Sequence, residues 1–348
     1  MTGKVPAVYL SFRIHRHCGS ITPTHNATHS SIHMHTEMIA PTPLTTPTSA
    51  TPAPAHIIPQ EAFNWYDEYA HGIIDRRTFM TRLGTLTATG LTMSALLGAL
   101  MPEYAQAEQV SFNDPDIKGR YVTFPSPQGH GEGRGYLVTP TKPVGKPGLI
   151  LVVHENRGLN PYIADVARRA AKAGFIAFAP DALHPKGGYP GNDDEGRALQ
   201  SSLDRAKIEQ DFIAAARFLK THEAGNGRLG AVGFCFGGYI VSMLAATIPD
   251  ALNAGVPFYG TPAAKEVRKN IKAPLLVQLA ELDDRVNAAW PECEADLKAG
   301  GVDYTLHRYP KCNHGFHNDS TARYDAENAR LAWDRTLAFF RKHLTTPA

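Results

Sequence analysis

"AVGFCFGGY", residues 231–239, is the stretch that decides the fold of this 348-residue chain. Its first half is an apolar run typical of a buried strand, and its second half opens the helical pattern GGYIVSMLAATI. Gly233 and Gly237 stand two residues before and after Cys235, and such small neighbours let a strand and a helix approach closely around a sharp turn. We therefore expect a strand–turn–helix unit with the Cys235 thiol at its turn. The alternative is a cysteine that fills space in the core, where small thiols are common.

Strands and helices alternate along the chain from about residue 121 onward. The segments GLILVVHE, FIAFAPDAL and PLLVQLAELD read as buried strands, and segments with helical spacing such as DRAKIEQDFIAAARFLKTH lie between them. This alternation predicts an α/β fold, with a mostly parallel central sheet and helices on both faces. In such sheets the reactive side chains lie just beyond the carboxyl ends of the strands.

Residues 1–57 differ in composition from everything that follows. They are rich in Thr, Pro, Ser and His, with almost no aliphatic periodicity, so we expect a disordered extension. A metal site built on its histidines is the alternative, but a specific site needs an ordered scaffold. Translation from Met34 or Met38 is a further possibility that the sequence leaves open. The histidines concerned are His25, His29, His33 and His35.

Residues 58–107 carry the marks of a twin-arginine export signal. Arg76 and Arg77 precede an uncharged, mildly apolar run over residues 83–101, and an A-x-A pattern follows at residues 105–107. A membrane anchor or a packed helix is the alternative, although the threonines and glycines of this run weaken the case for a stable span. The long stretch that precedes the arginines is the main objection to an export signal.

Cleavage after Ala107 leaves residues 108–348 as an exported, periplasmic α/β domain, and we expect no stable membrane span after it. A cytoplasmic location is the alternative. The formal net charge of +2 and the lack of a basic stripe argue against a nucleic-acid partner. Four cysteines without a C-x-x-C pair are too few for a disulfide scaffold. In an oxidising compartment, Cys293 and Cys312 could pair and leave Cys235 free.

Three candidate catalytic residues follow one another in the order nucleophile, acid, histidine. Cys235 stands at the turn, Asp283 ends the strand LLVQLAELD, and His314 lies in a loop before the last helix. An acid at the tip of an apolar strand can hold a histidine in the tautomer that activates a nucleophile. Asp284 and His317 are the alternatives for the acid and the histidine.

Glu155 ends an earlier strand in "LVVHENRGLN" and is the fourth candidate. A carboxylate close to the thiol could hold its proton, while a salt bridge to Arg157 is the simpler explanation. The backbone N–H groups of Asn156 and Phe236 are the candidate donors of an oxyanion hole.

Together these motifs resemble the dienelactone hydrolase family over roughly residues 121–344. The resemblance implies an α/β-hydrolase fold without a large lid domain. It also implies a Cys235–His314–Asp283 triad that hydrolyses a small ester or lactone through a thioester, with Glu155 holding the resting thiol. No metal or other cofactor is implied. The motifs are ENRGLN (155–160), APD (179–181), GFCFGG (233–238), LDDRV (282–286) and NHGF (313–316).

The chain departs from the family where members that act on dienelactone hold its carboxylate with arginines. One such arginine follows the histidine by a few residues, where this chain has residues 317–319, His-Asn-Asp. Arg197 is the candidate replacement, and Tyr259 is a second candidate for contact with the substrate. The alternatives to a hydrolase are a non-catalytic member of the fold that binds a small molecule, and an acyltransferase.

Overall fold

The computed structural model describes residues 58–100 and 107–345, which belong to one compact unit. The predicted disordered extension, its histidines and most of the A-x-A pattern therefore lie outside the described residues.

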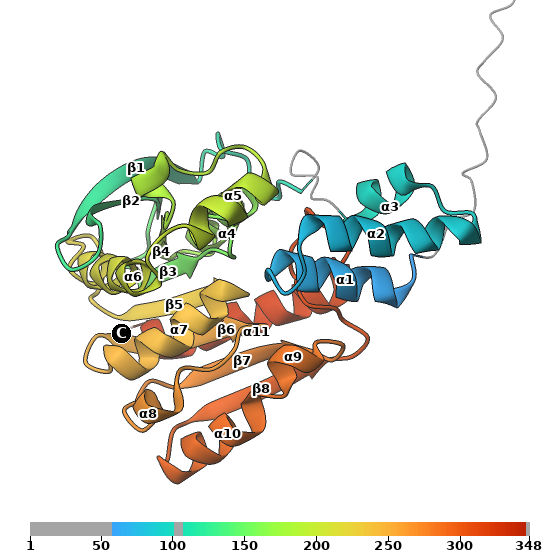
Figure 1. Cartoon of the computed structure of the whole chain (residues 1–348). Helices are drawn as coiled ribbons and strands as arrows, with labels where there is room; N and C mark the ends of the chain where they lie inside the picture. Colours follow the sequence, from blue (N-terminus) through green and yellow to red (C-terminus); the bar gives the residue numbers. More distant parts are fainter. Residues whose placement is uncertain (1–57, 101–106, 346–348) are drawn as a thin grey trace, which may run out of the picture. The chain divides into compact units, whose positions relative to one another are not determined.

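Eight strands form one mixed sheet, in the order β1-β2-β4-β3-β5-β6-β7-β8. β1 and β2 pair antiparallel with each other and β2 pairs antiparallel with β4, while all other neighbours are parallel. In Figure 1 the sheet runs from the green β1 to the orange β8. The mostly parallel α/β architecture predicted from the sequence is confirmed, with β1 as an additional edge strand. The strands are β1 (Ile117–Ser126), β2 (Gly131–Pro140), β3 (Leu149–Val153), β4 (Ile176–Pro180), β5 (Leu229–Phe234), β6 (Leu252–Phe258), β7 (Leu275–Ala280) and β8 (Tyr304–Tyr309).

Helices cover both faces of the sheet because the central strands are apolar on both sides. Along β3, Leu149, Leu151 and Val153 join one buried cluster, and the alternate residues Ile150 and Val152 join a second. The first cluster includes side chains of α6, α7 and α10, and the second includes side chains of α4 and α11. The helices are α4 (Pro161–Lys172), α5 (Asp193–Ser201), α6 (Arg205–Lys220), α7 (Phe236–Thr247), α8 (Lys265–Arg268), α9 (Asp284–Asn287), α10 (Trp290–Ala299) and α11 (Ala326–Leu344), with a short 3-10 helix, η3 (His184–Lys186).

The turn between β5 and α7 is as sharp as its glycines suggested. Cys235 has a φ of 57° and a ψ of −113°, which is strained for a residue with a Cβ. A Cβ on Gly233 would lie 2.2 Å from the carbonyl oxygen of Gly237, and one on Gly237 would lie 2.3 Å from that of Val153. Only glycine fits at these two positions, because the strand, the turn and the helix are in backbone contact there.

Residues 58–100 precede the sheet domain in the sequence and form a group of helices. Side chains of all its α-helices share a third buried cluster, which includes Tyr66, Phe79, Leu83 and Leu96. The apolar run that we interpreted as part of an export signal is therefore packed against α1 in this structure. Among the described residues, no helix is both long enough and apolar enough to cross a membrane. The helices are α1 (Gln60–Ala70), α2 (Arg76–Leu86), η1 (Thr87–Thr89) and α3 (Met93–Leu100).

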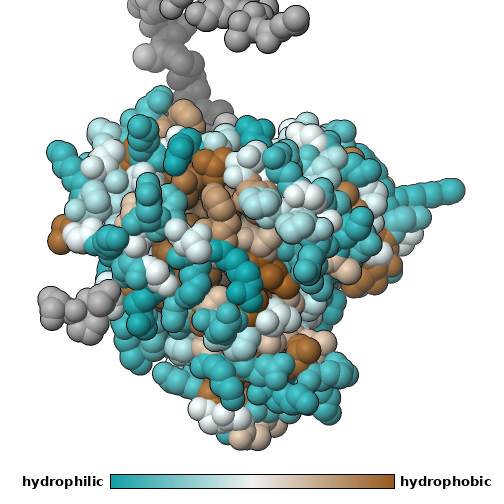
Figure 2. All heavy atoms as spheres, turned by 90° about the vertical axis from the view of Figure 1, so that its left-hand side faces the viewer, coloured by the Kyte–Doolittle hydropathy of each residue, from teal (hydrophilic) through white to brown (hydrophobic). Residues whose placement is uncertain are grey.

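Cys293 and Cys312 are free and buried, so the disulfide considered from the sequence is not present. Cys293 belongs to the first cluster and Cys312 to the second, and the sheet separates the two clusters. The face of the molecule in Figure 2 is mostly hydrophilic, with apolar side chains in small groups between polar ones.

Candidate active site

The parallel strands bring Cys235, Asp283 and His314 to one edge of the sheet. Cys235 caps α7 directly after β5, and Asp283 caps α9 after β7, where its Oδ1 accepts from the backbone N–H of Val286 at 3.2 Å. His314 follows β8 in the loop before α11. All three side chains are buried. Carboxyl ends of neighbouring parallel strands meet at the same edge, which is why residues far apart in sequence come together here.

His314 and Asp283 form a close pair, with 2.6 Å between His314 Nδ1 and Asp283 Oδ2. Asp284, the alternative acid, is exposed. His317, the alternative histidine, is buried with its Nδ1 2.8 Å from the hydroxyl of Tyr162. The structure therefore places Asp283, rather than its neighbour, beside His314, and places His314 rather than His317 in the group around the sulfur.

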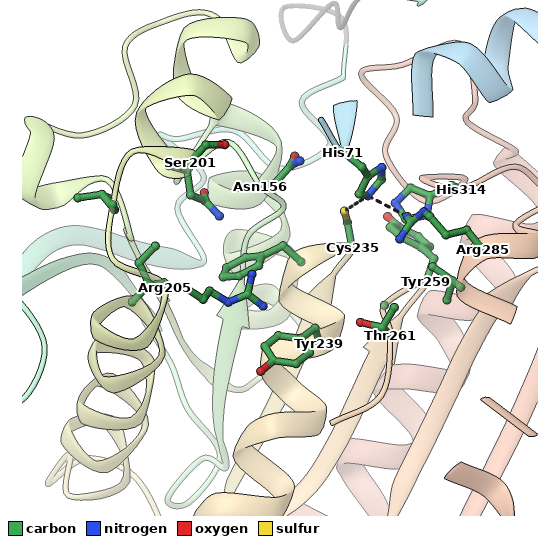
Figure 3. Close-up of a pocket in the computed structure, with 16 residues that line it drawn as sticks. His71, Asn156, Ser201, Arg205, Cys235, Tyr239, Tyr259, Thr261, Arg285 and His314 are labelled. Atoms are coloured by element: carbon green, nitrogen blue, oxygen red, sulfur yellow. Dashed lines mark hydrogen bonds between the residues drawn. The ribbon is translucent and has the colours of Figure 1, made fainter. Parts of the chain in front are cut away.

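The sulfur of Cys235 has a partner that the sequence motifs did not indicate. His71, at the end of α1, places its Nε2 3.2 Å from Cys235 Sγ (Figure 3). His314 Nε2 is buried and has no hydrogen-bond partner among the described atoms. The only sequence signal was the spacing of Asp67 and His71, one helical turn apart, in a segment that we interpreted as a leader.

The charges around the sulfur favour a thiolate. Burial alone would raise the pKa of the Cys235 thiol, but the positive charges of His71 and His314 hold that pKa well below its usual value. Burial likewise opposes the charge on His314, yet the negative charges of Asp67, Asp283 and Cys235 hold its pKa well above the usual value. A thiolate beside imidazolium groups is the reactive form of a cysteine.

Glu155 is buried at the end of β3, as expected from its place in the sequence. Burial raises the pKa of its carboxyl group. Its Oε2 accepts a hydrogen bond from Asn318 Nδ2 at 3.0 Å. Arg157, considered above as its salt-bridge partner, pairs with Asp193 at 2.5 Å. The contact to the thiol is thus made by His71, and the negative charge of Cys235 adds to the rise in the pKa of Glu155.

A pocket of about 370 Å³ opens over Cys235. Asn156, Phe236 and Tyr259 line it, as do two arginines, Arg205 and Arg285, that the sequence analysis did not single out as candidates (Figure 3). Phe236 is the first residue of α7, so its backbone N–H belongs to a helix N-terminus, where such groups are available to an anion.

Arg197, the predicted substrate contact, is not among the residues that line this pocket. Its guanidinium donates to the backbone oxygen of Tyr69 and lies over the ring of that residue, 3.9 Å from the ring centre. The structure therefore places Arg197 against α1.

Two groups of side chains among the described residues have the proximity that a metal ion requires. One consists of His71, Cys235 and His314, and the other of Asp67, Asp283 and His314. Within each group the ligand atoms lie within 4.8 Å of one another. Both groups are made of side chains that already form the site around the sulfur.

The strand order, the sharp turn after β5 and the His–Asp pair after β7 and β8 define the chain as an α/β hydrolase in fold. Comparison with known proteins identifies the family. The dienelactone hydrolase family matches residues 134–344. A second family, described as YqhI-like, matches residues 52–87. The chain belongs to the dienelactone hydrolase family.

Individual relatives agree with this assignment. A protein of Escherichia coli (strain K12) named "Putative hydrolase fragment YghX" is 63% identical over 114 residues, which cover 33% of this chain and 97% of that protein. A protein of Aquifex aeolicus named "Putative carboxymethylenebutenolidase" is 34% identical over 221 residues, covering 61% of this chain and 94% of that protein. The crystal structure titled "Putative Dienelactone Hydrolase" from Klebsiella pneumoniae is 26% identical, with a TM-score of 0.57, and the match covers 65% of this chain and 99% of that one.

Proposed function

We propose that this protein hydrolyses small esters or lactones through a thioester on Cys235, with His314 and Asp283 completing a catalytic triad. The observation that carries the proposal is the 2.6 Å contact between His314 and Asp283 beside a buried cysteine at a strained turn. A strained turn of this kind exposes its nucleophile to the pocket.

The reaction follows from the groups at this edge of the sheet. The thiolate of Cys235 attacks the acyl carbon, and the carbonyl π electrons move to the oxygen. The backbone N–H groups of Asn156 and Phe236 stabilise that oxyanion. When it collapses, the bond to the leaving oxygen breaks, and this oxygen takes the Nε2 proton of the His314 imidazolium, which becomes neutral. The product of this half-reaction is an alcohol and a thioester.

Hydrolysis of the thioester returns the thiolate. His314 takes a proton from a water molecule as the water oxygen attacks the thioester carbon, and the carbon–sulfur bond then breaks. Asp283 holds Nδ1–H of His314, so that Nε2 is free to accept the proton. Neither half-reaction requires an oxidant or a reductant.

The pocket favours a small substrate with a negative charge. Arg205 and Arg285 both line it, and guanidinium groups bind carboxylates through paired N–H donors. The name of the Aquifex aeolicus relative specifies a lactone that bears a carboxylate. We propose a carboxylated ester or lactone as the substrate class.

Residues 317–319, shortly after His314, include no arginine that could bind a substrate carboxylate, as the sequence suggested. His317, Asn318 and Asp319 contact Tyr162, Glu155 and Arg169 respectively. Any arginine that binds a substrate carboxylate must therefore come from elsewhere in the pocket.

Trapping of the acyl-enzyme tests the proposal. We expect the full chain, mixed with p-nitrophenyl acetate and quenched in acid, to carry one acetyl group on the peptide that contains Cys235. The peptides of Cys293 and Cys312 serve as internal controls, because both thiols are buried outside the pocket. Absence of acetylation while the ester is consumed would reject the thioester. An acetyl group that passes to an added alcohol in preference to water would indicate an acyltransferase, and neither acetylation nor turnover would favour a binding protein.

Replacing Glu155 with glutamine tests the electrostatic role of this carboxyl group. An ionised carboxylate disfavours a nearby thiolate, so the neutral amide should lower the pKa of Cys235. The acid limb of the kcat/KM profile is then expected to move to lower pH by about one unit or less. An acid limb that moves to higher pH would show that Glu155 stabilises the charged sulfur instead. Thermal unfolding of the variant provides the control for its fold.

Export through the twin-arginine pathway is also a proposal. It is supported by the exposed pair Arg76 and Arg77 at the start of α2. N-terminal sequencing of the protein purified from its host distinguishes a chain cut after Ala107 from one that keeps the preceding helices. The distinction affects the active site, because a chain cut there lacks His71.

A further inference from the structure

The residue in contact with the candidate nucleophile comes from outside the hydrolase family match. His71 lies in the region that matches the YqhI-like family, before the match to the dienelactone hydrolase family begins. Its Nε2 is 3.2 Å from Cys235 Sγ, and its ring packs edge-on against His314, with 4.8 Å between ring centres. Two histidines thus converge on one sulfur (Figure 3).

Contacts from the loop after β3 and from α5 hold the last turn of α1 in place. Asn156 Nδ2 donates to the backbone oxygen of Ala70, and Arg197 donates to that of Tyr69. These two carbonyls belong to the residues directly before His71. Because the backbone on that side is anchored both to the loop after β3 and to α5, the imidazole has little freedom to leave the sulfur.

Asp67 lies beside Nδ1 of His71, with its backbone oxygen as the hydrogen-bond acceptor and its carboxylate as a nearby charge. His71 Nδ1 is 2.8 Å from the backbone oxygen of Asp67 and 3.2 Å from its Oδ1. Burial disfavours the charge on this carboxylate, but His314, His71 and Arg323 hold its pKa well below the usual range. Asp67 and His71 therefore form a second acid–histidine pair at the same sulfur.

The charged groups that face His71 allow its ring to accept a proton. In the neutral ring with its proton on Nδ1, Nε2 can accept from Arg285 at 3.0 Å or from the Cys235 thiol at 3.2 Å. A neutral ring can take a proton from Cys235 at Nε2. Burial opposes the resulting charge, while the negative charges of Cys235 and Asp67 raise the pKa of His71 to about 9. Beside it, Asp67 Oδ2 is 3.6 Å from Arg285 Nε and can hold the guanidinium once the ring is charged.

We propose that His71 is a catalytic residue of this protein, and that the N-terminal helices are part of the active site. His71 takes the proton of the Cys235 thiol: the S–H bond breaks, an N–H bond forms at Nε2, and the total charge is unchanged. It keeps this proton and its charge while the thiolate attacks, whereas His314 gives its own Nε2 proton to the leaving oxygen, and the neutral His314 then activates water in the second half-reaction. The inference rests on the proposed function, because it takes Cys235 as the nucleophile.

The pH dependence of thiol alkylation tests this proposal without a substrate. The full chain is treated with iodoacetamide over a range of pH values, and the rate is measured by mass spectrometry on the peptide that contains Cys235. We expect His71→Gln to raise the midpoint of this profile by at least about one pH unit. Alkylation at pH values below both midpoints then slows about tenfold per unit, because the thiolate fraction falls by that factor. Asp67→Asn is expected to shift the midpoint in the same direction by a smaller amount.

Glu61→Ala is the matched control, since Glu61 lies on the exposed side of the same helix. Thermal unfolding shows whether each variant retains its fold. An unchanged midpoint in both His71→Gln and Asp67→Asn would overturn the inference. If acetyl-Cys235 still forms in that case, the proposed function stands without it. Conversely, the midpoint could depend on His71 in a protein that forms no acyl-enzyme. That outcome would reject the proposed hydrolase function, while the inference that His71 takes the proton of Cys235 would stand.

Discussion

Cys235→Ala is expected to lower kcat/KM for p-nitrophenyl acetate and for small lactones by at least about 10³-fold. The sulfur is the only part of the proposed triad that forms a bond to the substrate, and alanine offers no nucleophile in its place. The substitution keeps the Cβ at the strained turn, and small buried residues of this size are exchanged with limited effect on folding. Initial rates at several substrate concentrations, with thermal unfolding of each variant, provide the measurement.

Cys293→Ala and Cys312→Ala are the matched controls for this prediction. Both thiols are buried, and burial raises their pKa values to about 11 and about 12 respectively. They are therefore protonated and unreactive at neutral pH, and their removal should leave the rate near that of the wild type. Turnover that survives Cys235→Ala in a folded protein would contradict the proposal and indicate another nucleophile.

Asp283→Asn is expected to lower kcat by about 10³- to 10⁴-fold, the second large effect. The carboxylate accepts the Nδ1–H of His314, whereas an asparagine that presents its NH₂ group there would favour the tautomer with its proton on Nε2. That tautomer cannot accept a proton from water. The fold should tolerate the change, because Asp283 caps α9 and asparagine caps helices equally well.

Asp284→Asn is the control for this second prediction, since the neighbouring carboxylate is exposed. The measurement is kcat for both variants at the pH optimum of the wild type. A loss of less than tenfold in Asp283→Asn would contradict the assignment of the acid. Asp67 would then be the carboxylate to examine, because its Oδ1 lies 3.9 Å from His314 Nδ1.

The fold followed from the sequence because its determinants are local. Apolar runs that alternate with helical patterns leave few arrangements other than a parallel sheet covered on both faces. Gly233 and Gly237 made the sharp turn readable, since a Cβ at either position would overlap backbone atoms. β1 was harder to anticipate, because it is an edge strand whose exposed residues interrupt the apolar pattern.

The edge of the sheet at which the candidate triad lies could also be predicted from the sequence, for a topological reason. Cys235, Asp283 and the loop of His314 each follow a strand, and parallel strands carry such residues to one edge. The same reasoning placed Glu155 at this edge. It did not predict that Asn318 contacts Glu155, because that pairing depends on how the loop after β8 packs.

The sequence by itself determined the sheet, the turn that carries Cys235 and the order of the candidate triad, because each depends on short-range patterns or on strand order. Only the tertiary structure decided that His71 contacts the sulfur. His71 and Cys235 are 164 residues apart, and they meet because α1 docks on the loop after β3 and on α5. Such docking depends on the complementarity of two folded surfaces, and no local sequence pattern in either segment predicts that complementarity.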